Sequence, residues 1–126
     1  MNLVILVALG VLSGLLSGYL GVGAAIVMIP VLTGLMDYDQ KIAQSISLTV
    51  MVPMAIVGAF MYRFQFKLAP ALGPVCLLIA GAVGGSVLGS VLANRSPTRN
   101  LKLAFALFVI ATGAVLLAKA WKEKNA

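Results

Sequence analysis

Four apolar blocks separated by short polar stretches make up almost the whole chain. They run from about 3 to 36, 42 to 62, 68 to 94 and 103 to 118. A bilayer's hydrocarbon layer is about 30 Å thick and is crossed by about 20 helical residues. The second and third blocks have this length, and Lys102 and Lys119 can extend the shorter fourth block by reaching the interfaces. The pattern predicts an all-α membrane protein with about four transmembrane helices, forming one unit over residues 1–126.

The first block is too long for one straight crossing, because as a single helix it would measure about 50 Å at about 1.5 Å per residue. Its middle contains three closely spaced glycines: Gly18, Gly21 and Gly23. We therefore expect a glycine-rich hinge at 20–23 between a long helix over 3–19 and a short helix over 24–35. Pro30 can kink the short helix further. The alternative is a lipid-exposed helix with a tolerated kink.

Glycines also recur at intervals of four in two blocks, at Gly10, Gly14 and Gly18, and again at Gly81, Gly85 and Gly89. This spacing puts each set on one helix face and allows another backbone to approach closely, so it predicts helix packing. Serines lie beside both sets: Ser13, Ser17, Ser86 and Ser90. A serine hydroxyl that faces a cavity can bind a polar solute.

Composition and charge agree with a membrane protein and exclude several function classes. The chain is 62% hydrophobic and 10% charged, with a net charge of +6. Its basic residues lie at the ends of the blocks, where they meet lipid headgroups, and not in a basic stripe with aromatics, so no nucleic-acid partner is predicted. Histidine is absent and Cys76 is the single cysteine, so neither a metal site nor a cofactor is predicted. No block has a carboxylate in its middle and no nucleophile has a histidine partner, so we do not expect an enzyme.

Alternating crossings would divide the basic residues between the two membrane surfaces. One surface would hold Arg63, Lys67, Lys119, Lys122 and Lys124, and the other would hold Lys41, Arg95, Arg99 and Lys102. The excess of cytoplasmic Lys and Arg seen in membrane proteins favours the first set as cytoplasmic by a small margin. The expected location is the cell (inner) membrane, in a multi-pass arrangement.

The break in the first block is the feature that predicts chemistry. Irregular backbone at membrane depth is tolerated only where protein or a water-filled cavity covers it. A helix that begins there directs unpaired N–H groups and its positive dipole end at the gap, which suits an anion. The predicted solute-binding residues are Ser17, Gly21, Gly23 and Ala24 near the break, with Ser45, Ser47 and Thr49 from the second block. The three hydroxyls of the second block could equally bond to their own helix carbonyls.

Several stretches occur in an order that matches a known family. "GLLSGYLGVGAA", followed by Pro30 and Leu32, is similar to G-x-x-S-G-x-x-G-x-G-G-G followed by proline and leucine. "SISL", Pro53 and "GAFMYR" are similar to A-T-S-L, a proline and G-A-x-x-x-Y-R. "GSVLGSVLANRSPTR" and the stretch from Phe105 to Gly113 are similar to the family's later motifs. With these motifs in order over nearly its whole length, the chain resembles the TauE/SafE-like sulfite exporter family.

The resemblance implies a transporter, and more specifically an exporter, of small anions such as sulfite, sulfonates or related organic anions. Members of that family usually carry two such units in one chain, so a single unit implies a homodimer in the lipid bilayer. The sequence departs from the family pattern at Ala24 and Ala25, where glycines are usual, and at Ile46, where a threonine is usual. Ser47 matches the family's serine.

Two other functions remain as alternatives. A non-transporting scaffold or accessory subunit could keep the fold of the unit without its activity. A small multidrug-type exporter is also short and four-helical, but a cation–proton exchanger would need the intramembrane carboxylate that this chain lacks.

Overall fold

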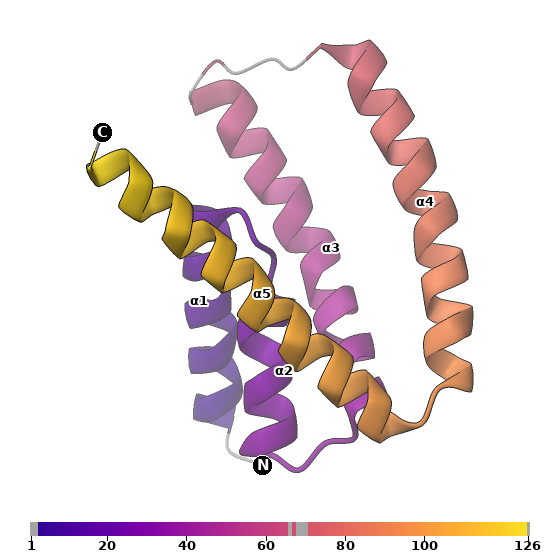
Figure 1. The fold of residues 1–126 in the computed structure, drawn as a ribbon. Coiled ribbons are helices and arrows are strands. Elements are labelled where there is room, and N and C mark those ends of the chain that lie inside the picture. Colours follow the sequence, from indigo (N-terminus) through magenta and orange to yellow (C-terminus); the bar gives the residue numbers. More distant parts are fainter. Residues whose placement is uncertain (1–2, 66, 68–70, 126) are drawn as a thin grey trace.

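The structure, a computed structural model, describes residues 3–65, 67 and 71–125 as a set of α-helices joined by short connections (Figure 1). The helices are α1 (Leu3–Leu20), α2 (Ala25–Gly34), α3 (Gln40–Gln65), α4 (Leu72–Arg95) and α5 (Thr98–Lys124). All of them except α2 are long and apolar enough to cross a membrane. The prediction of an all-α membrane protein with four spans is therefore confirmed, and so is the division of the first block into a long and a short helix.

The break between α1 and α2 depends on two glycines. Gly21 has a φ of +67° and Gly23 has a φ of +79°, in the left-handed region that glycine adopts at little cost. Ala24 has a φ of −69°, and Ala25 is the first residue of α2. The alanines at 24 and 25 therefore occupy right-handed backbone that any residue adopts, and they do not alter the break. The non-helical segment begins one residue later than predicted.

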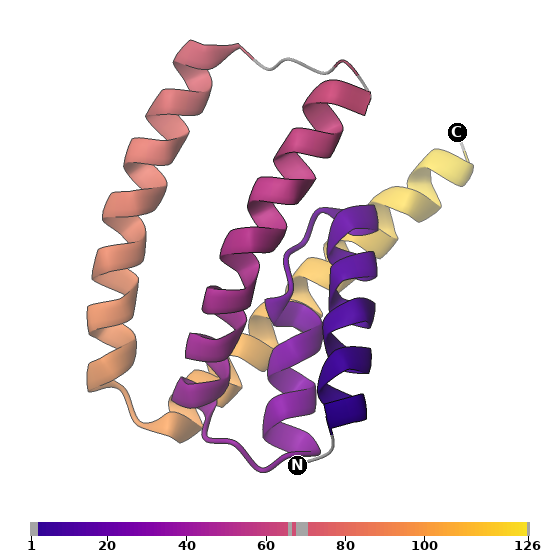
Figure 2. The same ribbon diagram turned by 180° about the vertical axis from the view of Figure 1, so that it is seen from behind.

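The chain reverses direction at the break. Figures 1 and 2 show α2 running back beside α1, so that the start of α1 and the end of α2 lie at the same end of the molecule. A Cβ atom added to Gly23 would lie 2.8 Å from Met51 Cε. Met51 lies near the middle of α3, a helix of 26 residues. If α3 crosses the bilayer, the break lies at membrane depth.

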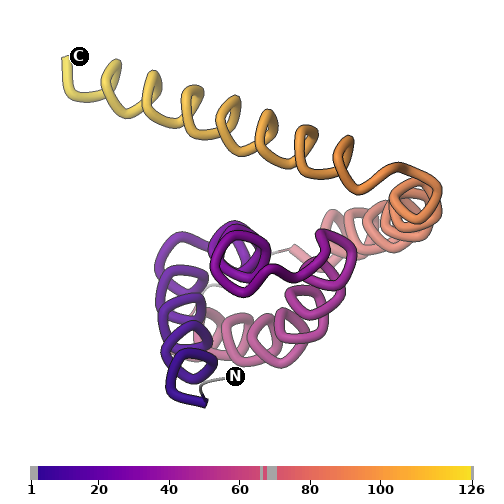
Figure 3. The backbone as a smooth tube through the Cα atoms, turned by 90° about the horizontal axis from the view of Figure 1, so that it is seen from below, coloured from indigo at the N-terminus to yellow at the C-terminus, as the bar shows by residue number. Residues whose placement is uncertain are grey.

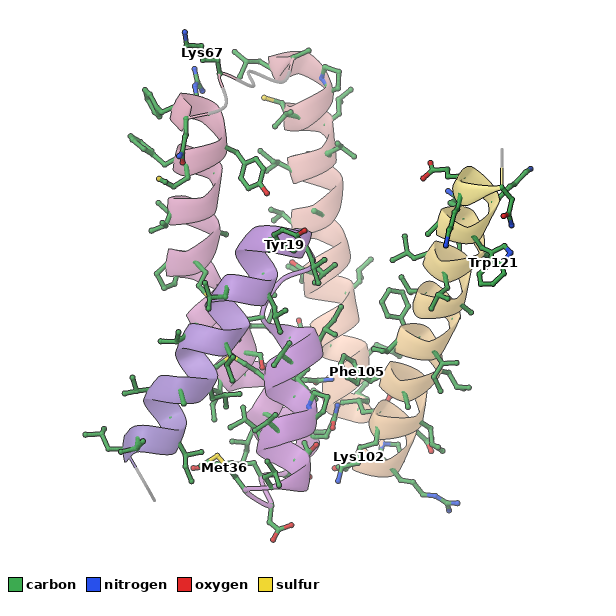
Figure 4. All side chains as sticks on the ribbon, turned by 90° about the vertical axis from the view of Figure 1, so that its left-hand side faces the viewer. Tyr19, Met36, Lys67, Lys102, Phe105 and Trp121 are labelled. Atoms are coloured by element: carbon green, nitrogen blue, oxygen red, sulfur yellow. The ribbon has the colours of Figure 1, made fainter. Side chains whose placement is uncertain are left out.

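The remaining helices run in alternating directions. Figure 4 shows Lys67 and Trp121 toward one end of the molecule and Met36 and Lys102 toward the other. At the second end, Lys41 Nζ donates a hydrogen bond of 2.9 Å to the Asn94 carbonyl oxygen, which joins the start of α3 to the end of α4. Seen from below, α5 runs away from the other helices toward its C-terminal end (Figure 3).

The core is small and surrounds α2. Its buried apolar residues are Leu9, Ala24, Met28, Ile29, Leu32 and Ala43, from α1, α2, α3 and the break. Phe105 of α5 packs against this cluster. Neither α4 nor α5 buries any residue that the structure describes. A Cβ atom added to any glycine of the two four-spaced sets would meet nothing within 4 Å, so within one chain these glycines are not at tight helix crossings.

Candidate functional site

An open groove of ≈ 1210 Å³ lies between the second half of α1 and the second half of α3. Its walls include Gly14, Leu15, Ser17 and Gly18 from α1, Gly21, Val22 and Gly23 from the break, and Met51, Met54, Ala55, Gly58, Met61 and Tyr62 from α3. Small side chains on both walls leave the space open. The lining is mostly apolar and carries no ionisable acid or base other than the tyrosines. The groove reaches the break through Gly21 and Gly23.

The start of α2 lies at the break with part of its backbone unpaired. The carbonyl oxygen of Ala24, the N-cap residue, accepts hydrogen bonds from the amides of Val27 (3.2 Å) and Met28 (2.9 Å). No side chain caps this terminus. The amides of Ala25 and Ile26, which precede those two, have no acceptor in the described part of the chain. These orphan donors and the positive end of the helix dipole make the start of α2 attractive to an anion.

Ser47 supplies a third unpaired donor near the break. Its side chain is 0% exposed, and its Oγ finds no hydrogen-bond partner among the described residues. Ser47 lies one helical turn before Met51, on the face of α3 that packs against α2. Leaving a buried hydroxyl without a partner costs about 1–3 kcal/mol, so the protein retains an unfavourable group beside α2. A second buried unpaired group, Gln40 Nε2, lies at the start of α3, far from the break.

The structure brings together some of the predicted solute-binding residues and separates others. Ser17, Gly21 and Gly23 line the groove. Ala24 is buried at the start of α2, and Ser47 is buried against α2.

Ser45 and Thr49 do not reach the groove. Both are exposed, on the side of α3 opposite Ser47, and Thr49 Oγ1 donates a hydrogen bond of 2.9 Å to the Ser45 carbonyl oxygen. Ser86 and Ser90 likewise bond to carbonyls of α4. Thr49, Ser86 and Ser90 therefore bond to carbonyls of their own helices, whereas the Ser47 hydroxyl is buried without a partner among the described residues.

Sequence reasoning missed the wall that α3 contributes. Met51, Ala55, Gly58 and Tyr62 line the groove and follow one another at intervals of three or four residues, which places them on one helix face. Tyr62 Oη donates a hydrogen bond of 2.9 Å to the Gly18 carbonyl oxygen on the opposite wall. The spacing of small residues at Ala55 and Gly58 was the available signal.

Metal chemistry has no candidate in the parts of the chain that the structure covers. No three of the cysteine, aspartate and glutamate residues there come together as a possible metal site. What the groove and the start of α2 offer is hydrogen-bond donors without fixed charge.

The comparison with family models decides the relationship of this chain to known proteins. The family described as Sulfite exporter TauE/SafE matches residues 1–117 of the 126. The chain belongs to this family. The matched residues of this TauE/SafE family member include both walls of the groove, the break and the whole of α2. Searches among curated proteins and among solved structures found no match.

Membership of the TauE/SafE family gives the general function. The family consists of membrane transporters and not of enzymes, and its description names sulfite as the exported solute. Together with the four long apolar helices, this identifies the chain as a membrane protein of a transporter family.

Proposed function

We propose that this TauE/SafE family member exports small anions such as sulfite, sulfonates or related organic anions across the cell (inner) membrane, as a multi-pass protein. One observation carries the proposal. Helix α2 begins beside the middle of α3 with the amides of Ala25 and Ile26 unpaired, at the end of a groove without fixed charge. An anion that leaves water needs such donors, and cations do not.

The arrangement suits transport better than tight binding. An oxyanion in the groove would approach the break along the side that Ser17, Gly21 and Gly23 line. The amides of α2 and the Ser47 hydroxyl supply its hydrogen bonds there, while no lysine or arginine side chain lines the groove to hold it. A permeating solute must be bound well enough to enter and weakly enough to leave.

Reconstituted liposomes provide the test. Vesicles that contain the purified chain should release loaded sulfite faster than empty vesicles. Methanesulfonate should compete with sulfite, while methanesulfonamide, a neutral molecule of nearly the same shape, should compete at least about tenfold less well because it gains little from the helix dipole. Equal competition by both molecules would contradict an anion site. Absence of any flux would favour the scaffold or accessory-subunit alternative.

We also propose that the working unit is a homodimer. The groove is open on one side, and the described residues of α4 and α5 bury nothing, so one chain gives the polar backbone at the break little shielding from lipid. The glycine face of α4, at Gly81, Gly85 and Gly89, is free for close approach by another helix.

A cysteine at Gly85 in a Cys76→Ala background tests the dimer. Two copies that meet at this face should form a disulfide across it, and a cysteine at Val87, on the opposite face of α4, should form far less. Full transport by a chain shown to be monomeric would overturn the dimer while leaving the anion site intact.

A further inference from the structure

One hydrogen bond crosses the groove. Tyr62, near the end of α3, donates its hydroxyl hydrogen to the Gly18 carbonyl oxygen, near the end of α1, over 2.9 Å. Both residues line the groove, and 44 positions separate them in the sequence. The bond therefore joins the two walls directly.

The acceptor is a carbonyl that α1 itself leaves unpaired. Helix α1 ends at Leu20, so its last carbonyls lack the amides of a following turn. The Ser17 carbonyl receives the Gly21 amide at 2.8 Å, and the Gly18 carbonyl receives Tyr62 instead. In an apolar setting a carbonyl without a donor is costly, so this bond favours the position of α1 against α3.

Little else holds the two walls together. The helix pairs that pack closely are α2 with α3, α3 with α5 and α1 with α2. Helix α1 thus packs on α2, below the groove, and approaches α3 across open space. Gly14, Gly18 and Gly58 line the groove, and a Cβ atom added to any of them would meet nothing within 4 Å. Separating the end of α1 from α3 requires breaking the Tyr62 bond but little packing.

We propose that Tyr62 is a positioning residue whose hydrogen bond to Gly18 holds the two walls of the groove together; this rests on the proposed role of the groove as the solute pathway. When the two walls separate, the Gly18 carbonyl oxygen loses the Tyr62 hydroxyl and accepts a hydrogen bond from water instead. An oxyanion in the groove then receives the Tyr62 hydroxyl as a donor, and a hydrogen bond to an anion is stronger than one to a neutral carbonyl. The solute itself therefore favours the state in which the two walls are separated.

The test measures the separation of the walls without measuring transport. Spin labels go on cysteines at Leu12 in α1 and Ile56 in α3, which are exposed and do not line the groove, in a Cys76→Ala background. Tyr62→Phe keeps the ring and removes only the hydroxyl. Loss of one side-chain hydrogen bond within a membrane shifts an equilibrium between two states roughly three- to eighteen-fold. In Tyr62→Phe, the ratio of molecules with separated walls, seen as the longer label distance, to those with joined walls should therefore rise by a factor in that range.

Tyr19→Phe is the matched control. Tyr19 also borders the groove, and its hydroxyl has no partner in the described residues, so its loss should leave the distance distribution unchanged. Should Tyr62→Phe fold poorly, the unmodified Tyr62 protein gives a second measurement, because methanesulfonate should lengthen its label distance. An unchanged distance in Tyr62→Phe, or an equal change in both tyrosine variants, overturns the proposed role of the bond between Tyr62 and Gly18. Failure of the proposed function appears differently: the label distance changes as expected in Tyr62→Phe, but the unmodified protein shows no sulfite flux.

Discussion

The two halves of this molecule are similarly apolar but differ in what they bury. Around α2, side chains from α1 and α3 form a core that includes buried serines at 13 and 47. Helices α4 and α5 are longer than α1, yet none of their described residues is buried. Apolar composition places both halves in the membrane. Burial arises where the glycine break lets a short helix fold back between its neighbours.

Polar groups follow the same division. In α4 and α5, the hydroxyls of Ser86, Ser90 and Thr112 bond to carbonyls of their own helices. The unpaired donors of Ser47 and of the first α2 amides lie in the other half, beside the break. A half with a core can hold polar groups without partners at a cost, and such groups are the ones available to a solute.

The largest effect should come from a bulky residue at the break. Gly23→Leu forces a left-handed φ on a leucine and pushes it into Met51, so sulfite flux should fall at least about tenfold while the protein still inserts. Gly113→Leu in α5, where a Cβ meets open space, should keep nearly normal flux. Flux in liposomes, normalised to protein in the membrane fraction, measures both. Normal flux from Gly23→Leu would remove the break from the mechanism.

A pair of phenylalanines in α5 tests how far the core extends. Phe105 is half-buried against the core cluster, whereas Phe108 is exposed. Phe105→Ala should lower stability by about 1–2 kcal/mol, less than the loss for a fully buried phenylalanine, and Phe108→Ala should have little effect. Thermal unfolding in detergent compares them. Equal losses would mean that α5 is not anchored through Phe105.

Two serines distinguish a solute-binding hydroxyl from one that bonds only to its helix. Ser47→Ala removes an unpaired buried hydroxyl, so stability should stay the same or rise, while the KM for sulfite should increase about fivefold for the loss of about 1 kcal/mol of binding. Ser90→Ala should change neither quantity, because Ser90 bonds to the Val87 carbonyl. A loss of stability without a change in KM would show that Ser47 has a structural role.

The smallest effects concern backbone conformation alone. At Gly21 a Cβ would meet no neighbour within 4 Å, but the φ of +67° disfavours alanine, so Gly21→Ala should cost about 1–2 kcal/mol. Gly113→Ala, within helix α5, should instead gain roughly 0.5–1 kcal/mol. Opposite signs in the two unfolding curves are the expected result. Stabilisation by both changes would contradict the left-handed backbone at Gly21.

Length and composition predicted most of the fold. The first block had to break because it exceeds the bilayer, and glycine clusters are where a helix can do so. The helix bounds were predicted less well, because α3 (Gln40–Gln65) and α5 (Thr98–Lys124) continue past the charged residues that flank their apolar blocks. The face of α3 that lies toward the break could not be predicted from the sequence, because the side chains of Ser45, Ser47 and Thr49 are similarly polar. Only packing against α2 distinguishes them, and it buries Ser47 and exposes the other two.

The bond between Tyr62 and Gly18 was also beyond sequence reasoning. It joins residues on two helices whose approach depends on the angle at which the chain turns at Gly21 and Gly23. Sequence spacing identifies residues that share a face of one helix. It does not fix which faces of two helices meet.

The reversal at the break has a consequence for how two such units can be combined. Because α2 returns to the end at which α1 begins, α3, α4 and α5 carry the chain to the opposite end, and Figure 1 shows the two chain ends on opposite sides. A second unit attached by a short linker would therefore begin on the far side of the membrane and lie upside down relative to the first. Gene duplication and fusion of this unit would produce inverted repeats, the arrangement on which many transporters are built.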